Sequence, residues 1–75
     1  SKPTYKQLKD FETLEKQIHE LETEKDLVMG RMNSGNETPE NITALSVKYN
    51  ELAQLIDDKT IQWMELAEII ENAKS

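Results

Sequence analysis

The chain has 75 residues, a formal net charge of −6, 32% charged residues and no cysteine. This length allows one small domain with a thin core, and the lack of cysteine excludes disulfide frameworks, thiolate metal sites and thiol nucleophiles. The surplus of negative charge argues against a general affinity for nucleic acid. The sequence has no signal-peptide layout and no apolar run near the roughly 20 residues of a membrane span, so we expect a soluble, cytoplasmic chain.

The first predicted element is a helix over about residues 4 to 33, which Pro3 and Thr4 can open. Apolar residues recur along it at alternating spacings of three and four, the a and d pattern of a coiled-coil seam. These positions are Phe11, Leu14, Ile18, Leu21, Lys25, Val28 and Met32. A seam this narrow indicates a helix that pairs with one other helix.

A turn over about residues 34 to 38 follows this helix. Gly35 is the expected C-cap in the left-handed conformation, because a residue without Cβ adopts a positive φ at no steric cost. Thr38 is the expected N-cap of the next helix, with Pro39 at the first helical position and Glu40 beside the positive end of the helix dipole.

The second predicted helix runs over about residues 39 to 72 with a seam of the same spacing. Its seam positions are Ile42, Leu45, Tyr49, Leu52, Ile56, Lys59, Trp63, Leu66, Ile70 and Ala73. The two seams match when the numbers of facing residues sum to 73 or 74, which sets Phe11 against Trp63 and Lys25 against Tyr49. The predicted fold class is all-α: an antiparallel two-helix coiled-coil hairpin, one domain over residues 1–75, about 45 to 50 Å long and monomeric because its seams close on each other.

Two lysines, Lys25 and Lys59, interrupt the apolar seams. We expect each to lay its aliphatic stem along the seam and to lift its ammonium to a neighbouring carboxylate or to water. A polar residue at an a or d position can also fix the register of paired helices at a cost in stability, which is a second role open to them.

Four lysines gather on the predicted outer face of the first helix near its start. Lys2, Lys9 and Lys16 share the f position, and Lys6 lies beside them at c. They are the candidate nucleic-acid-binding residues, since clustered lysines reach phosphates as point charges. The alternative is a solvated helix surface with ion pairs along the helix, such as Glu12 with Lys16.

Two apolar residues of the second helix, Ile61 and Met64, lie off the seam at f and b, and Leu55 and Ile69 at g widen the apolar surface. Ile61 and Met64 are the candidate partner-binding residues, although scattered apolar exposure is also normal on a helix. His19, the only histidine, has no converging partners, so we predict no metal site, no cofactor and no catalytic residue.

Three segments match the residue pattern of one family: Lys2-Pro3-Thr4-Tyr5-Lys6, then Leu14-Glu15-Lys16-Gln17-Ile18-His19-Glu20-Leu21-Glu22-Thr23-Glu24, and Thr60-Ile61-Gln62-Trp63-Met64-Glu65-Leu66. Together they resemble the C-terminal domain of the ABC-F ATPases, the family that includes Uup. That domain typically starts with a Lys-Leu-Ser-Tyr-Lys-type segment and closes its second helix with a Tyr-x-x-Trp-x-Glu-Leu-type segment. Pro3 and Thr60 depart from this pattern.

The resemblance implies a piece cut from the C-terminus of a longer, non-transporter ATPase that acts on ribosomes or nucleic acid, with the ATPase domains of the same polypeptide as partners. In Uup-like members this appendage is associated with DNA binding. No Gly-x-x-x-x-Gly-Lys-Ser/Thr loop occurs in the 75 residues, so we predict no enzymatic activity for the chain itself. The predicted function is a non-catalytic arm that contacts DNA or ribosomal RNA weakly and without sequence specificity. The alternative is a structural protein–protein adaptor with no nucleic-acid role.

Overall fold

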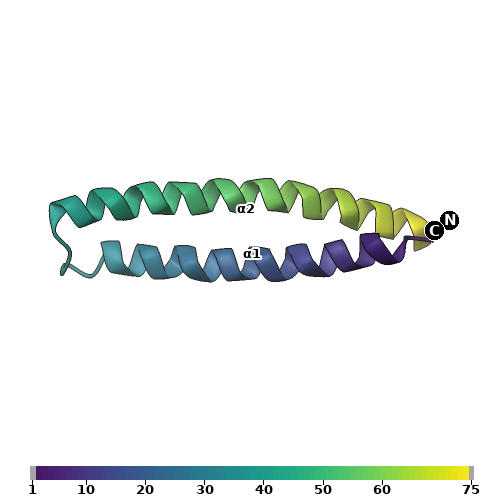
Figure 1. Ribbon diagram of the computed structural model, residues 1–75, viewed down its shortest axis with the longest axis horizontal. Helices are drawn as coiled ribbons and strands as arrows, with labels where there is room; N and C mark the ends of the chain where they lie inside the picture. The colour runs from purple at the N-terminus through teal and green to yellow at the C-terminus, as the bar shows by residue number, and fades with distance from the viewer. Residues whose placement is uncertain (1, 75) are drawn as a thin grey trace.

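The computed structural model describes residues 2–74. They form two helices, α1 (Tyr5–Met32) and α2 (Pro39–Lys74), joined by a turn over residues 33–38. The helices run side by side in opposite directions, so that the start of α1 and the end of α2 lie together at one end of the rod (Figure 1). We call this end the open end and the opposite one the turn end. The predicted all-α hairpin is confirmed.

The rod extends 55 Å along its longest axis, beyond the expected 45 to 50 Å. The reason is the length of α2, which has 36 residues and continues past position 72 to Lys74. At a rise of ~1.5 Å per residue, this helix alone accounts for about 54 Å.

A capping box starts α1 at Thr4. The Thr4 Oγ1 accepts a hydrogen bond from the Gln7 backbone N–H at 3.0 Å, and the Gln7 Oε1 accepts one from the Thr4 backbone N–H at 2.9 Å. Thr4 itself has extended backbone angles, with φ −74° and ψ 160°. Two backbone N–H groups that a bare helix terminus would leave unpaired are satisfied in this way, which sets the helix boundary at Tyr5.

The C-terminal cap of α1 is Asn33, and not Gly35 as predicted. Gly35 does have the expected left-handed conformation, with φ 78°, but it lies two residues further on, within the bend. The Ser34 hydroxyl donates a hydrogen bond to the Arg31 carbonyl oxygen at 2.8 Å. Because this side chain satisfies a carbonyl in the last turn, the helix ends without a glycine at its cap.

The start of α2 agrees with the prediction. The Thr38 Oγ1 accepts a hydrogen bond from the Asn41 backbone N–H at 3.1 Å, and Pro39 is the first helical residue. Glu40 lies in the first turn, where its carboxylate meets the positive end of the helix dipole. Both helix starts are therefore encoded by a threonine cap.

The best-packed part of the seam lies between the middle of the rod and the turn end. Leu52 is the most buried side chain, with 2% of its surface exposed, and it forms one cluster with Val28 and Leu45. Three half-buried residues pack against this cluster: Leu21, Met32 and Tyr49. All six occupy predicted seam positions, so the heptad pattern identifies the core correctly.

Two contacts between the helices confirm the predicted register. The rings of Phe11 and Trp63 stack with their centroids 5.4 Å apart and an interplanar angle of 23°. The Lys25 Nζ lies 5.6 Å from the centroid of the Tyr49 ring. Lys25 thus lies over an aromatic face and not beside a carboxylate, because the ring quadrupole attracts an ammonium held over it.

Candidate nucleic-acid interface

The structure places three of the four candidate lysines on the exposed surface of α1: Lys6, Lys9 and Lys16. Lys9 and Lys16 are two helical turns apart, about 10.5 Å along the axis. Lys2 lies outside α1, so the prediction that it shares their f position is wrong. The physical reason is the N-cap at Thr4, whose own backbone is extended, so that the helix begins only at Tyr5. Lys2 instead borders a hollow of about 300 Å³ between the start of α1 and the end of α2.

Two of these lysines form ion pairs with acidic residues of the same helix. The Lys6 Nζ lies 2.6 Å from Asp10 Oδ2, and the Lys9 Nζ lies 3.4 Å from Glu12 Oε2. Glu12 therefore pairs with Lys9 and not with Lys16. The Lys9 ammonium also lies 6.0 Å from the ring centroid of Tyr5. Exposed pairs of this kind are worth roughly 0.2 to 1 kcal/mol, so a phosphate can displace the carboxylate.

Positive and negative side chains alternate across this surface. The hollow of about 340 Å³ between Lys9 and Lys16 is also bordered by Glu12 and Glu20. The Lys16 side chain has no ion pair among residues 2–74, so no carboxylate holds its ammonium. Such a surface suits weak phosphate contacts that salt screens easily.

The candidate partner-binding residues Ile61 and Met64 both face solvent, with exposed fractions of 56% and 58%. They are three residues apart and therefore neighbours on the surface of α2. Leu55 is exposed as well, but it lies nine residues before Met64, which at ~100° per residue puts it on the opposite side of the helix. The prediction that Leu55 widens the Ile61–Met64 surface is therefore wrong.

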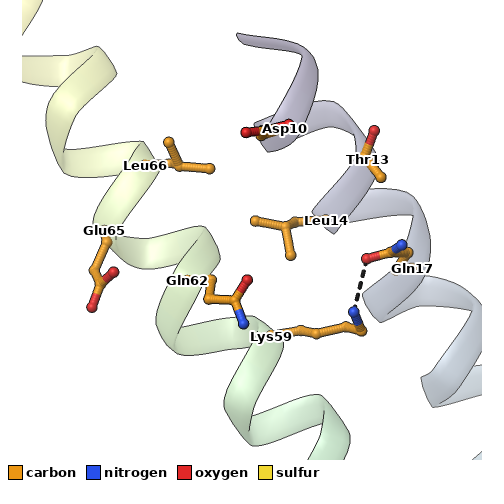
Figure 2. A pocket seen from close by; sticks show the side chains of 8 residues that line it. All are labelled: Asp10, Thr13, Leu14, Gln17, Lys59, Gln62, Glu65 and Leu66. Atoms are coloured by element: carbon orange, nitrogen blue, oxygen red, sulfur yellow. Dashed lines mark hydrogen bonds between the residues drawn. The ribbon is translucent and has the colours of Figure 1, made fainter. Parts of the chain in front are cut away.

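A polar groove of about 450 Å³ lies between the helices in the half of the rod nearer the open end (Figure 2). Figure 2 shows Lys59 extending from α2 toward α1, where its Nζ donates a hydrogen bond to the Gln17 Oε1 at 3.0 Å. The ammonium of this second seam lysine thus donates to an amide oxygen and not to a carboxylate. The groove is lined by Asp10, Thr13, Leu14, Gln17, Lys59, Gln62, Glu65 and Leu66. It brings together no nucleophile with a general base, so its chemistry is hydrogen bonding and charge contact.

A clamp at the turn end was not predicted. The Arg31 Nη2 and Nε donate hydrogen bonds to Glu37 Oε1 at 3.1 and 3.3 Å, and the Asn41 Nδ2 donates one to Glu37 Oε2 at 3.0 Å. These bonds, that of Arg31 foremost, hold the pKa of Glu37 below its ordinary value of 4.5. The contact spans six residues across a turn, and no periodic signal in the sequence marks it.

A second contact that was not predicted, an ion pair between the two helices, is indicated by the heptad positions of its residues. The Lys48 Nζ lies 3.4 Å from Glu24 Oε1, across the two helices. Both residues occupy g positions of the predicted heptads, where opposite charges pair in coiled coils. Applying that rule to the predicted register would have found this pair.

The described residues contain neither a group of three or more side chains that could hold a metal ion nor a helix long and apolar enough to cross a membrane.

The chain matches one family model in the comparisons with known proteins. The model describes the ABC transporter C-terminal domain, and the match covers residues 2–68. No curated protein and no solved structure matches the chain.

Proposed function

The chain belongs to the ABC transporter C-terminal domain family, and from this premise we propose that it is the non-catalytic C-terminal arm of an ABC-F type ATP-binding protein. In this proposal the arm contacts nucleic acid, either DNA or ribosomal RNA, weakly and without reading its sequence. The family membership assigns the chain to the C-terminal region and not to the ATPase cassette. The narrower ABC-F assignment rests on the resemblance of the Tyr5-Lys6 and Trp63-Met64-Glu65-Leu66 segments described above.

The observation that carries the nucleic-acid contact is the exposed lysine surface of α1, formed by Lys6, Lys9 and Lys16. An ammonium in an exposed ion pair exchanges its carboxylate for a phosphate at little cost, because the pair contributes at most about 1 kcal/mol. Phosphate contacts position a protein on a nucleic acid but carry no sequence information. The side chains on this surface therefore favour contact with the sugar-phosphate backbone alone.

The number of lysines that contact phosphates limits how steeply the affinity for nucleic acid falls with salt. If only Lys2 and Lys16 reach phosphates, the log-log slope of affinity against salt is about −1.8 on duplex DNA, and if all four lysines do, it is about −3.6. The surrounding acidic surface and the net charge of −6 keep the affinity at the weak end of non-specific binding.

The test is fluorescence anisotropy with a labelled DNA duplex and a labelled RNA hairpin, at about 50 and 200 mM salt. The variant K9Q/K16Q removes two positive charges from α1. The matched control A44E/N50E lowers the net charge by the same two units on exposed positions of α2. We expect K9Q/K16Q to lose binding and A44E/N50E to weaken it only slightly. Equal loss in both variants would show that net charge, and not this surface, governs the interaction.

The second candidate function is a protein–protein adaptor with no nucleic-acid role. Two observations favour it: the Lys6 and Lys9 ammonium groups already have carboxylate partners, and Ile61 and Met64 expose more than half of their surface. Absence of anisotropy change with both nucleic acids at the lower salt concentration would make this the better assignment.

A further inference from the structure

The two long sides of the hairpin differ in character. On one side lies the polar groove with Lys59. On the other side a hollow of about 320 Å³ opens between the helices, where Ile18, Thr60 and Trp63 are half-buried. Three exposed residues of α1 complete its lining: Glu15, His19 and Glu22. We call this side the Trp63 face.

The surface that Trp63 leaves open is apolar. Its Nε1, the only polar atom of the side chain, is buried and has no hydrogen-bond partner. The partly exposed remainder of the ring is therefore carbon, stacked on one side against Phe11. A tryptophan in this state gains free energy when another apolar group covers it.

Apolar side chains continue this face along both helices. Leu8 lies two turns before Glu15 on the same side of α1 and is 41% exposed. Met64 follows Thr60 by one turn on α2 and is 58% exposed, and the half-buried Ala67 comes one turn later. Thr60 and Ala67 are small, so a further helix can approach α2 closely there.

The charged residues at the heptad positions of this side are acidic, apart from Lys74 at the end of α2. In the predicted heptads, the e and b positions of the two helices lie on the Trp63 face, and between residues 5 and 73 every lysine and arginine falls at other positions. The charged residues at e and b are Glu12, Glu15, Glu22, Asp26, Asp57 and Glu71. Glu12 is paired with Lys9. Glu15 and Glu22 line the hollow on the α1 side, and Asp57 and Glu71 belong to α2, so acidic residues of both helices flank the apolar surface of Trp63 and form its acidic margins.

We propose that the Trp63 face is a docking surface for an amphipathic helix whose apolar stripe is flanked by lysines or arginines. The apolar surface around Trp63 would bury the apolar stripe of the partner helix, which supplies affinity. The acidic margins of this chain would pair with the basic residues that flank that stripe, which sets the orientation of the partner helix. A second copy of this chain would bring acidic margins against acidic margins, and a nucleic acid would bring phosphates against them. The proposal concerns a different surface from the lysines of α1 and does not depend on them.

The single tryptophan makes the test direct, since its fluorescence reports only on this face. The probe is a synthetic helical peptide of about 18 residues, five turns, with leucines in one stripe and lysines on both flanks. The control peptide keeps the leucines and replaces the lysines by glutamates. We expect the lysine peptide to shift the Trp63 emission to shorter wavelength in a saturable way, and the glutamate peptide to leave it unchanged.

Two variants of the chain complete the experiment. M64K places a positive charge inside the Trp63 face and should weaken binding of the lysine peptide at least about tenfold. L55K makes the same change of charge at another exposed apolar residue, on the side of α2 opposite Met64, and should bind like the parent. K16Q, which breaks no ion pair, should also bind the peptide unchanged, even if it weakens nucleic-acid binding, so that the two proposals fail separately.

Three results would overturn the proposal. The first is no shift with the lysine peptide, or an equal shift with both peptides. The second is an equal loss of binding in M64K and L55K, which would mean that net charge alone matters. The third is an emission shift that grows with the concentration of the chain alone, because then a second copy covers the face.

Discussion

Replacing Leu52 by alanine tests whether the middle of the seam holds the hairpin together. Leu52 is 2% exposed and packs with Val28 and Leu45. A buried Leu→Ala change costs roughly 2 to 5 kcal/mol, and a core only one layer thick can relax around the cavity, so we expect about 2 to 3 kcal/mol. A 75-residue domain is typically stable by about 4 to 11 kcal/mol. The substitution should therefore remove a large share of the total stability.

The assay is urea unfolding followed by far-ultraviolet circular dichroism. With a slope of ~1 kcal/mol per molar urea for a small domain, the midpoint should fall by about 2 to 3 M. The matched control is L55A, which makes the same change on α2 at a residue that is 45% exposed. Because leucine and alanine both favour helices, L55A should stay within about 0.5 kcal/mol of the parent. Equal shifts in L52A and L55A would refute the packing described for this seam.

Two further predictions concern single side chains. For the turn clamp, the pKa of Glu37 is lowered in the folded state, so its contribution to stability is present above the pKa of the unfolded chain and is lost as the pH falls through the folded pKa. The melting temperature of E37Q should accordingly lie below that of the parent at neutral pH and approach it in acid; a constant difference at all pH values would contradict the clamp. For the aromatic layer, W63A should cost about 2 kcal/mol, less than the roughly 3 to 5 of a fully buried tryptophan, because the ring is only partly buried. W63F should lower the free energy of unfolding clearly less than W63A does, since it keeps a ring against Phe11 and removes a buried donor that has no acceptor. A W63F variant as unstable as W63A would show that the indole itself is required.

The hairpin was predictable because its determinants are local or periodic. Threonine caps at Thr4 and Thr38 and the positive φ of Gly35 follow from the properties of single residues. The register follows from the spacing of the two seams, and the contact of Phe11 with Trp63 confirms it. A seam of constant period on both sides of a short turn admits one antiparallel alignment that buries every layer.

The candidate lysine surface was predictable in part. The heptad position of Lys9 and Lys16 places them outward, as observed. The pairing of Lys9 with Glu12 was not predictable, because several carboxylates lie within reach along a helix and the choice depends on rotamers. Lys2 was misplaced because the heptad count was carried through Thr4, where the helix has not yet begun.

The sequence by itself determined which residues of this protein face the partner helix, where the chain turns and on which surfaces its charges lie, since these depend on the helical period and on the preferences of single residues. Only the tertiary structure decided how well each layer is covered and which partners the polar side chains choose. Leu52 is buried while Trp63 stays partly exposed, although both occupy seam positions, and Lys59 bonds to Gln17, 42 residues away in the chain. The physical reason is that burial and hydrogen bonding depend on the sizes and rotamers of side chains from both helices at once, and no period of one helix contains that information.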